Sequence, residues 1–393
     1  MVQDHYKPNR SAIVGIGSTD YSTESGRSVL SLAVECCRKA VEDAGLQAHE
    51  VDGVLTFNAG DSVSAEAVAN SLGLPELNYV MEWYAGGFAP SALVQLAGML
   101  TATGTCKSVL IFRAMNGRSG YRLGGTDWSF KADGMWQYRM PYGYLTYPQT
   151  MAMWCRRHMI QYGTTSEQLA SIAINQRKNA LFNEKAMMKK SISLDDYFNS
   201  KIIVEPFRVL DLCLETDGGC ALLVTSAERS EDCRRKPVFI KAAAYVGGPG
   251  IGSDWADFFL WDDLTENFTV SLGKKLYRQA GLTPDDIDVA QIYDCFTHTV
   301  ILGLEGLGFC KKGEGGSFAA SGETALSGTI PVNTGGGMLS EAYIHGMNVV
   351  AEAAVQLRGM GNDRQVQHAT HAIVTSGAWQ AGSGMILTNE KGT

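Results

Sequence analysis

The chain repeats one short pattern in its two halves. The segment A44-G-L-Q-A-H-E-V-D-G-V-L-T-F57 corresponds to A280-G-L-T-P-D-D-I-D-V-A-Q-I-Y293, with Ala-Gly-Leu and an aspartate at matching places. Later in each half, V94-Q-L-A-G-M99 corresponds to V355-Q-L-R-G-M360, and an apolar stretch follows both. Two matches in the same order indicate an internal duplication, and this constrains the fold more than any other feature.

Each half alternates short apolar strands with helical segments. Residues 27–43, for example, carry apolar side chains at helical spacing and end at Ala44-Gly45, a favourable helix end. This alternation predicts an α/β fold with parallel strands and right-handed crossovers. Two such halves joined face to face would form five layers in the order αβαβα. We place the first half at residues 1–236 and the second at 237–393.

The first half contains a long insertion, at about residues 116–235, that is rich in aromatic residues and methionine. Stripes of this kind usually form core or a subunit interface, and the alternative is contact with a substrate. Its large side chains include Tyr138, Tyr142, Tyr144, Tyr147, Met151, Met153 and Trp154.

Composition excludes several classes of protein. A net charge of −8 argues against nucleic acid as the main partner, and no apolar run is long enough to span a bilayer. The nine cysteines include no C-x-x-C pair. They therefore predict reduced, mostly buried thiols, no zinc site in this chain and a cytoplasmic location.

Two polar stretches stand where apolar runs end. Q291-I-Y-D-C-F-T297 closes a predicted strand, and Gly335–Gly337 precede Tyr343 and His345 at the start of a predicted helix, Gly346–Leu357. Glycine lets a backbone approach a ligand closely, and the start of a helix offers unpaired N–H donors. A Gly-rich turn alone is more often a plain connection. The second polar strand end favours a binding or catalytic site.

These stretches resemble motifs of the thiolase superfamily. Sterol-carrier-type thiolases carry H-D-C-F and N-x-x-G-G-x-x-x-x-G-H-P, where this chain reads Y293-D-C-F296 and N333-T-G-G-G-M-L-S-E-A-Y-I. Both family histidines fall on tyrosines, Tyr293 and Tyr343. The nucleophilic cysteine falls on Gly87 of Y84-A-G-G-F88, and the late C-x-G motif is missing from S376-G-A-W379.

The resemblance implies a thiolase fold whose covalent chemistry has been lost. Gly87 cannot hold an acyl group, so Tyr293 and Tyr343 are the predicted proton-handling residues, and Cys295 is a further candidate catalytic residue. A C–C cleavage next to a thioester expels an enolate, whose charge the protein must stabilise. The groups predicted to bind this oxyanion or the substrate are His345, Asn333, Gly86, Gly87 and Gly336.

The pattern Y-D-x-F-T with E-A-Y-I-H-G is similar to that of "lipid-transfer" thiolase-like subunits, for which two activities are known. One is CoA-dependent retro-Claisen cleavage of 2-benzoylsuccinyl-CoA to benzoyl-CoA and succinyl-CoA. The other is retro-aldol cleavage of a steroid β-hydroxyacyl-CoA. Steroid aldolases read Y-D-H-F, so Cys295 favours the benzoylsuccinyl-CoA reaction. The missing nucleophile favours the retro-aldol reaction, which needs no acyl acceptor. An alternative of another class is a non-catalytic acyl-CoA or lipid-binding subunit.

The resemblance also implies partners. Subunits of this group work with a small zinc-ribbon/OB-fold protein, so we expect a homodimer of this chain with two such partners, an α2β2 heterotetramer. Coenzyme A would enter as part of the substrate, and the zinc would lie in the partner. We expect neither nucleic acid nor a membrane among the partners.

Overall fold

The computed structural model describes residues 7–122, 136–247 and 262–392. Part of the predicted insertion, residues 123–135, lies outside these ranges. In the first half the elements are β1 (Ser11–Ser18), α1 (Val29–Ala44), β2 (Gly53–Asn58), α2 (Ala65–Leu72), β3 (Tyr79–Tyr84), α3 (Ala89–Ala102), β4 (Ser108–Asn116) and β7 (Asp217–Ser226). In the second half they are β8 (Val238–Gly247), α8 (Thr269–Ala280), β9 (Val289–Gln291), α9 (Thr297–Gly306), α10 (Gly315–Ala320), α11 (Gly337–Ser340), α12 (Met347–Leu357), β10 (His371–Ser376) and β11 (Ala381–Thr388).

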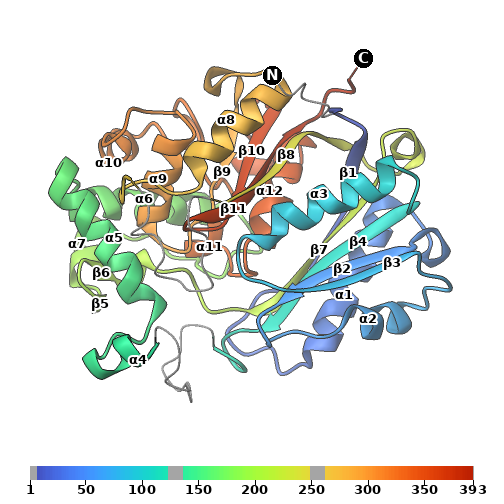
Figure 1. Cartoon of the computed structure of the whole chain (residues 1–393), viewed down its shortest axis with the longest axis horizontal. Coiled ribbons are helices and arrows are strands. Elements are labelled where there is room, and N and C mark those ends of the chain that lie inside the picture. The colour runs from blue at the N-terminus through green and yellow to red at the C-terminus, as the bar shows by residue number, and fades with distance from the viewer. Residues whose placement is uncertain (1–6, 123–135, 248–261, 393) are drawn as a thin grey trace.

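The insertion between β4 and β7 is mainly helical. It contains α4 (Trp136–Arg139), α5 (Tyr147–Tyr162), α6 (Ser166–Leu181), α7 (Leu194–Asn199), β5 (Ile202–Val204) and β6 (Phe207–Arg208). Helix α6 packs against α9, α10 and α11, so the insertion lies beside the second half, where Figure 1 shows the green and orange segments together. The insertion thereby reaches the neighbourhood of the Gly-rich loop that precedes α12.

Nine strands form one sheet in the order β3-β2-β4-β7-β1-β8-β11-β10-β9. The prediction of parallel strands was wrong for most of it. Only β3-β2-β4 and β10-β9 run parallel, whereas β7 is antiparallel to both β4 and β1, and β11 is antiparallel to both β8 and β10. The physical reason lies in the connections, because β10 and β11 follow each other too closely for a crossover helix.

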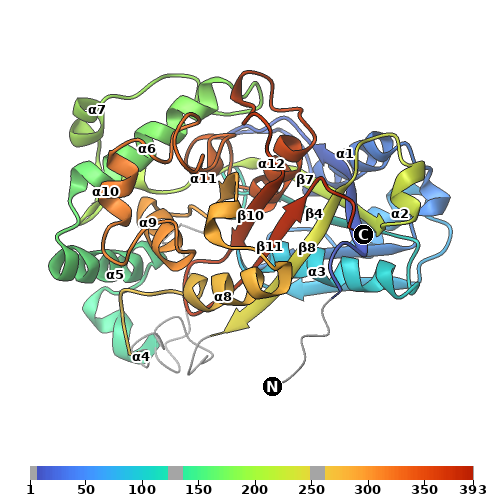
Figure 2. The same ribbon diagram turned by 90° about the horizontal axis from the view of Figure 1, so that it is seen from above.

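The helices build the predicted five layers around these strands. Helices α3 and α12 touch each other, and each contacts strands of both halves, whereas α1 contacts β1, β4 and β7 and α8 contacts β8 and β11 (Figures 1 and 2). Side chains of β1 alternate accordingly: Ala12 and Val14 face the core under α1, and Ile13 faces the core that contains α3 and α12. The first-half strands and the second-half strands of this one sheet form the two β layers, with α3 and α12 between them and α1 and α8 outside them. The order of layers is therefore α, β, α, β, α.

The duplicated aspartates, Asp52 and Asp288, make equivalent hydrogen bonds in the two halves. The Asp52 carboxylate accepts backbone N–H groups at the start of β4 at 2.8 and 3.1 Å, and Asp288 accepts those at the start of β10 at 2.7 and 2.8 Å. Gly45 and Gly281, which end α1 and α8, both adopt the left-handed conformation with φ of 76° and 67°. The first sequence match therefore reflects equivalent structure.

The second sequence match has the correct order of elements but the wrong register. Both segments lie in or next to the central helices. Residues 94–99 lie inside α3, whereas residues 355–360 run past Leu357, the last residue of α12. Small and apolar side chains are frequent in all buried helices, which explains a coincidental alignment of letters.

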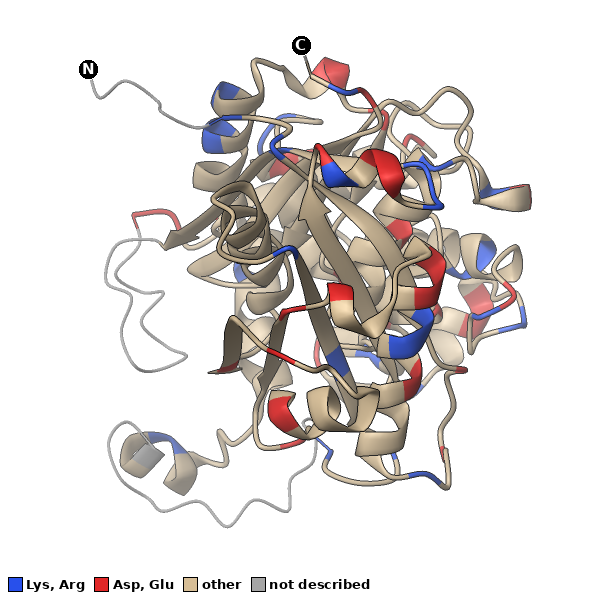
Figure 3. Ribbon diagram, turned by 90° about the vertical axis from the view of Figure 1, so that its right-hand side faces the viewer, with Lys and Arg blue, Asp and Glu red and all other residues tan. Residues whose placement is uncertain are grey.

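None of the helices in the described ranges is long and apolar enough to cross a bilayer. On the face drawn in Figure 3, acidic and basic residues are interspersed over the outer helices.

Candidate active site

Tyr293 stands just past the end of β9, where several groups fix its backbone. The side chain of Asn333 bonds to both backbone groups of Ile292, at 2.8 and 2.9 Å, and the N–H of Tyr293 donates to Oγ1 of Thr375 at 2.9 Å. The Tyr293 side chain is buried, with 4% of the residue exposed. Its phenol therefore has a defined direction, toward the start of α3.

Gly87 leaves the space that this phenol occupies. A Cβ atom at Gly87 would lie 1.9 Å from the hydroxyl oxygen of Tyr293 and 2.2 Å from the ring carbon that carries it. At Gly346, a Cβ atom would lie 2.9 Å from another carbon of the same ring. A side chain at position 87, such as the cysteine that the resemblance would place there, is therefore sterically incompatible with the present position of Tyr293.

Tyr343 lies against Tyr293. Its N–H donates to Oγ1 of Thr216 at 2.9 Å, and its phenol is close enough to that of Tyr293 for each to affect the pKa of the other. Burial raises the pKa of both phenols well above the ordinary value of tyrosine, and each is raised further by ionisable neighbours. Both phenols are therefore protonated near neutral pH and serve as hydrogen-bond donors.

Cys295 and Tyr147 complete a cluster of phenols and thiols. Tyr147, which begins α5 of the insertion, hydrogen-bonds with Cys295 and stacks on Phe296 with ring centroids 5.9 Å apart. Burial and the Asp294 carboxyl raise the pKa of the Cys295 thiol far above its ordinary value. Cys295 is thus a neutral thiol, whereas a nucleophile must be a thiolate.

His345 lies on the other side of Tyr343, with ring centroids 5.2 Å apart. Nδ1 of His345 is 3.4 Å from Nη2 of Arg113, which forms a buried ion pair with Asp61 at 2.5 Å. Burial and the Arg113 charge lower the pKa of His345 to about 3. Its other nitrogen, Nε2, faces the turn before α3, 3.7 Å from where a Cβ of Gly86 would lie.

Asn333 and Gly336 hold the Gly-rich loop. Besides the Asn333 contacts with Ile292, the N–H of Gly336 donates to the Asn333 carbonyl at 2.8 Å. Gly336 has φ of 104° and passes so close to Ala180 that a Cβ would lie 2.6 Å from the alanine methyl. Their predicted contact with substrate stays a prediction, because these polar groups are used within the loop.

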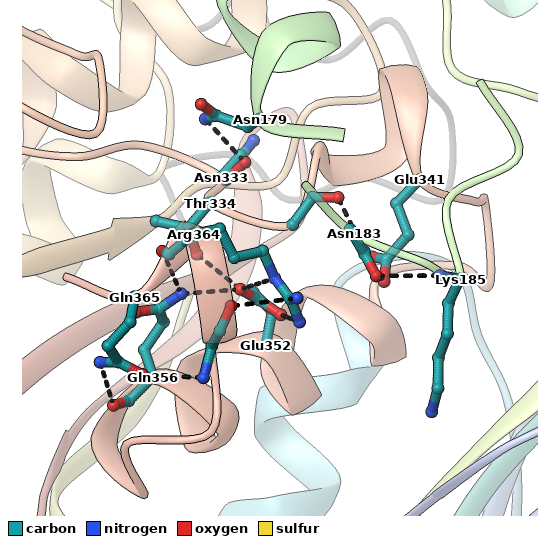
Figure 4. Close-up of polar contacts among 12 residues, drawn as sticks. Asn179, Asn183, Lys185, Asn333, Thr334, Glu341, Glu352, Gln356, Arg364 and Gln365 are labelled. Carbon is teal, nitrogen blue, oxygen red and sulfur yellow. Dashed lines mark hydrogen bonds and ion pairs between the residues drawn. The ribbon is translucent and has the colours of Figure 1, made fainter. Parts of the chain in front are cut away.

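A network of buried polar side chains holds the Gly-rich loop in place (Figure 4). Glu352 pairs with Arg364 through two contacts of 3.0 Å and accepts the Thr334 hydroxyl at 2.7 Å. On the other side of the loop, Glu341 accepts the side-chain amide of Asn183 at 2.9 Å. Networks satisfied in this way rigidify their surroundings, so the loop presents Tyr343 and His345 from a fixed frame.

Asp294 joins the two predicted stretches. Its carboxylate accepts the backbone N–H groups of Met338 and Leu339 at 2.9 and 3.1 Å, and it is fully buried. Burial raises the pKa of Asp294 to about 7. The residue after Tyr293 therefore caps α11, the short helix that begins at the last of the three glycines and precedes Tyr343.

We expect Asp294→Ala to lower the free energy of unfolding by about 2 kcal/mol or more, because it leaves two buried N–H groups without acceptors. Urea denaturation measures the change. The matched control is Asp285→Ala, which removes an exposed carboxylate and should change stability by less than about 0.5 kcal/mol. If Asp294→Ala lowers the free energy of unfolding as little as Asp285→Ala, the hydrogen bonds from Asp294 to α11 do not stabilise the fold.

Sequence reasoning missed Arg113 and Asp61 and left Tyr147 undecided. Arg113 interrupts the apolar strand β4 yet is fully buried, and a charge in such a strand is the signal that was available. Asp61 lies in a loop after β2 and offered no pattern. The structure brings Tyr293, Tyr343, Cys295 and His345 together with the turn at Gly86 and Gly87.

The chain is similar to several known proteins over nearly its whole length. Residues 250–389 match a family model described as thiolase C-terminal domain-like. The chain is 42% identical over 387 residues to a steroid side-chain-cleaving aldolase of Thermomonospora curvata, covering 97% of this chain and 98% of the relative. It is also 42% identical over 391 residues to the 17-hydroxy-3-oxo-4-pregnene-20-carboxyl-CoA lyase of Mycobacterium tuberculosis, covering 96% and 99%. The solved structure of an Ltp2-ChsH2(DUF35) aldolase superposes with a TM-score of 0.91 at 41% identity, covering 99% and 100%.

The chain belongs to the thiolase superfamily. Within it, the chain is a member of the sterol-carrier-type thiolase-like group and an enzyme, either thiolytic or a lyase. In the described parts of the chain, no group of His, Cys, Asp or Glu is arranged to hold a metal ion.

Proposed function

We propose that this enzyme is a lyase that cleaves a steroid β-hydroxyacyl-CoA by a retro-aldol reaction. The observation that carries the proposal is the buried, neutral phenol of Tyr293 in the space where a nucleophilic side chain at position 87 would stand, with the second phenol, Tyr343, beside it. A retro-aldol reaction needs proton transfer and enolate stabilisation but no acyl acceptor. Two relatives that match nearly the whole chain carry the names of such lyases.

The benzoylsuccinyl-CoA reaction that the sequence favoured has less support. It rested on Cys295, but this thiol is buried and its raised pKa keeps it protonated. Without a thiolate, free CoA would have to attack the ketone directly. Among the relatives, the names support the alternative reading, so we reverse the order of the two.

The proton balance of a retro-aldol cut suits two adjacent phenols. The O–H and Cα–Cβ bonds of the substrate break, the hydroxyl oxygen becomes a ketone, and the α-carbon carries the electron pair as a thioester enolate. One proton leaves the hydroxyl and one is added to the α-carbon. If one phenol accepts the first proton while passing its own through the second, neither tyrosine has to become a phenolate, which burial disfavours.

The enolate oxygen needs donors in a water-poor site. Nε2 of His345 faces the turn at Gly86 and Gly87, which leads directly into α3. In the first turn of α3 the N–H of Ala89 donates to the Gly86 carbonyl, the N–H of Ser91 donates to Ser376, and Pro90 has no N–H, so the backbone donors that we propose are the N–H groups of the two glycines. Preorganised donors of this kind typically contribute about 10²- to 10³-fold in kcat. We therefore assign the thioester oxygen to the space between His345 and the start of α3.

The name of one similar solved structure supports a proposal about a partner. The similar solved structure is named for a complex with a DUF35 protein, so we propose a small partner of that type, a zinc-ribbon/OB-fold protein that carries its own zinc. We further propose that the chain forms a homodimer through β3, which is an edge strand of the sheet. Tyr84 at its end is 80% exposed and lies close in sequence to Gly86.

The proposed function predicts cleavage without added CoA. The chain, purified with its DUF35-type partner, should convert 17-hydroxy-3-oxo-4-pregnene-20-carboxyl-CoA to a 17-ketosteroid and a three-carbon acyl-CoA, measured by liquid chromatography. The comparison is 2-benzoylsuccinyl-CoA with and without free CoA. Cleavage of the second substrate alone, dependent on free CoA, would overturn the proposal.

A further inference from the structure

Three buried side chains form a line behind the turn at Gly86. Asp61, in the loop after β2, pairs with Arg113 of β4 at 2.5 Å, and Arg113 contacts Nδ1 of His345 at 3.4 Å. The ion pair is almost completely removed from solvent, with the two side chains 0% and 1% exposed. The backbone N–H of Ala59 also donates to Asp61 at 3.0 Å, which fixes the carboxylate from its far side.

Burial of this ion pair carries a large unfavourable desolvation free energy. Two charges lose their hydration, and apolar residues of similar volume often stabilise a protein as well or better. Nε of Arg113 is among the buried atoms that have no hydrogen-bond partner within the described residues. The arrangement therefore has a cost that core packing alone does not explain, and this points to a role in the site.

Arg113 dictates which nitrogen of His345 carries the proton. A guanidinium has five N–H donors and no acceptor, so the imidazole nitrogen that it contacts must be the acceptor. Nδ1 of His345 then has no proton, and a neutral ring has its proton on Nε2. An imidazolium would point a second N–H at the guanidinium, which both charge and hydrogen bonding oppose.

The ring is also held in direction. It lies between Tyr343, at 5.2 Å, and Phe57, at 5.7 Å between centroids, and the Arg113 guanidinium lies 5.3 Å from the Phe57 ring centroid. The backbone of His345 has φ of 53°, a left-handed conformation that non-glycine residues adopt rarely and that occurs at functional sites. Nε2 consequently faces Gly86, at the turn before α3.

We propose that Arg113, held by Asp61, is a positioning residue that keeps His345 in the neutral form with its proton on Nε2, so that this N–H donates to the enolate oxygen of the substrate. The inference rests on the proposed function for the identity of that oxygen. The tautomer itself does not depend on it. Histidine in this site thus acts as a fixed hydrogen-bond donor and takes no part in proton transfer.

The direct test is NMR of the full chain, in complex with its partner, labelled with 15N-histidine. The chain has seven histidines, and loss of one signal in His345→Gln assigns the residue. At pH 7 we expect one nitrogen of His345 to be protonated, with the pattern of the Nε2–H tautomer. An Nδ1–H tautomer or an imidazolium in the unmodified protein would overturn the proposal, and this result does not depend on any variant of Arg113.

The second arm uses Arg113→Met, which removes the donors, and Arg113→Lys, which keeps a charged donor. The Met variant should show mixed tautomers, or an imidazolium at pH 6, and a kcat lowered about 10²-fold with a smaller change in KM. The Lys variant should recover part of both. An unchanged His345 spectrum in a folded Met variant would contradict the proposal. A correct tautomer without cleavage of the steroid thioester would instead disprove the proposed function alone.

Discussion

Tyr343→Phe should lower kcat by about 10²-fold or more on the steroid β-hydroxyacyl-CoA, and Tyr293→Phe should do the same. Each substitution removes one hydroxyl from the pair that lies between the turn at Gly87 and the start of α12, and it breaks the relay of protons from substrate hydroxyl to α-carbon. The ring remains, so the fold should stay intact. Steady-state kinetics of the complex with its partner measures the loss.

A matched control separates chemistry from packing. Tyr277 of α8 is also partly buried, and its hydroxyl donates to the Leu307 carbonyl at 2.9 Å, away from the site. Tyr277→Phe should cost about 1 kcal/mol of stability and leave kcat unchanged. Full activity of both site variants would favour the rival interpretation, in which this chain is a non-catalytic acyl-CoA or lipid-binding subunit and the partner or another protein does the chemistry.

Gly87→Ala should abolish most activity and lower stability, although it adds a single methyl group. That methyl would lie 1.9 Å from the Tyr293 hydroxyl oxygen, a distance at which one of the two must move. Overpacking of this kind costs about 1–3 kcal/mol, and displacement of the reacting phenol by about 1 Å is enough to lose about 10²-fold in rate. Thermal denaturation and kcat measure the two effects together.

The neighbouring glycine provides the control. Among the described residues, a Cβ at Gly86 would meet Nε2 of His345 alone, at 3.7 Å, which is ordinary van der Waals contact. Gly86→Ala should therefore leave the melting temperature nearly unchanged, in contrast to Gly87→Ala. If Gly87→Ala is as stable and active as the unmodified protein, the phenol does not occupy the space of the lost cysteine.

Much of the fold could be predicted from the sequence because the duplication leaves local signals. The Ala-Gly-Leu turn and the aspartate that clamps the next strand recur as letters, and both recur as structure at Asp52 and Asp288. The strand directions could not be predicted in this way. They depend on how β7 returns from the insertion and how β11 follows β10, and neither has a local pattern.

Only those residues of the candidate site that belong to sequence motifs could be predicted. Tyr293, Tyr343 and His345 occupy stretches in which several neighbours, such as Asn333 and Asp294, fix the loop or the helix. Arg113 acts from a strand more than two hundred residues away from His345 in sequence. Tyr147 belongs to an insertion whose packing against α9, α10 and α11 no spacing rule describes, so its contact with Cys295 required the three-dimensional structure.

The central claim is that this scaffold breaks a C–C bond with phenols and without a covalent thiol intermediate. Intact-protein mass spectrometry of samples quenched during turnover of the steroid thioester, with no CoA added, tests it most directly. We predict full product formation with ketone and acyl-CoA in equal amounts and every chain at its unmodified mass. A chain heavier by one acyl group, located on a cysteine and formed as fast as the enzyme turns over, would contradict the account.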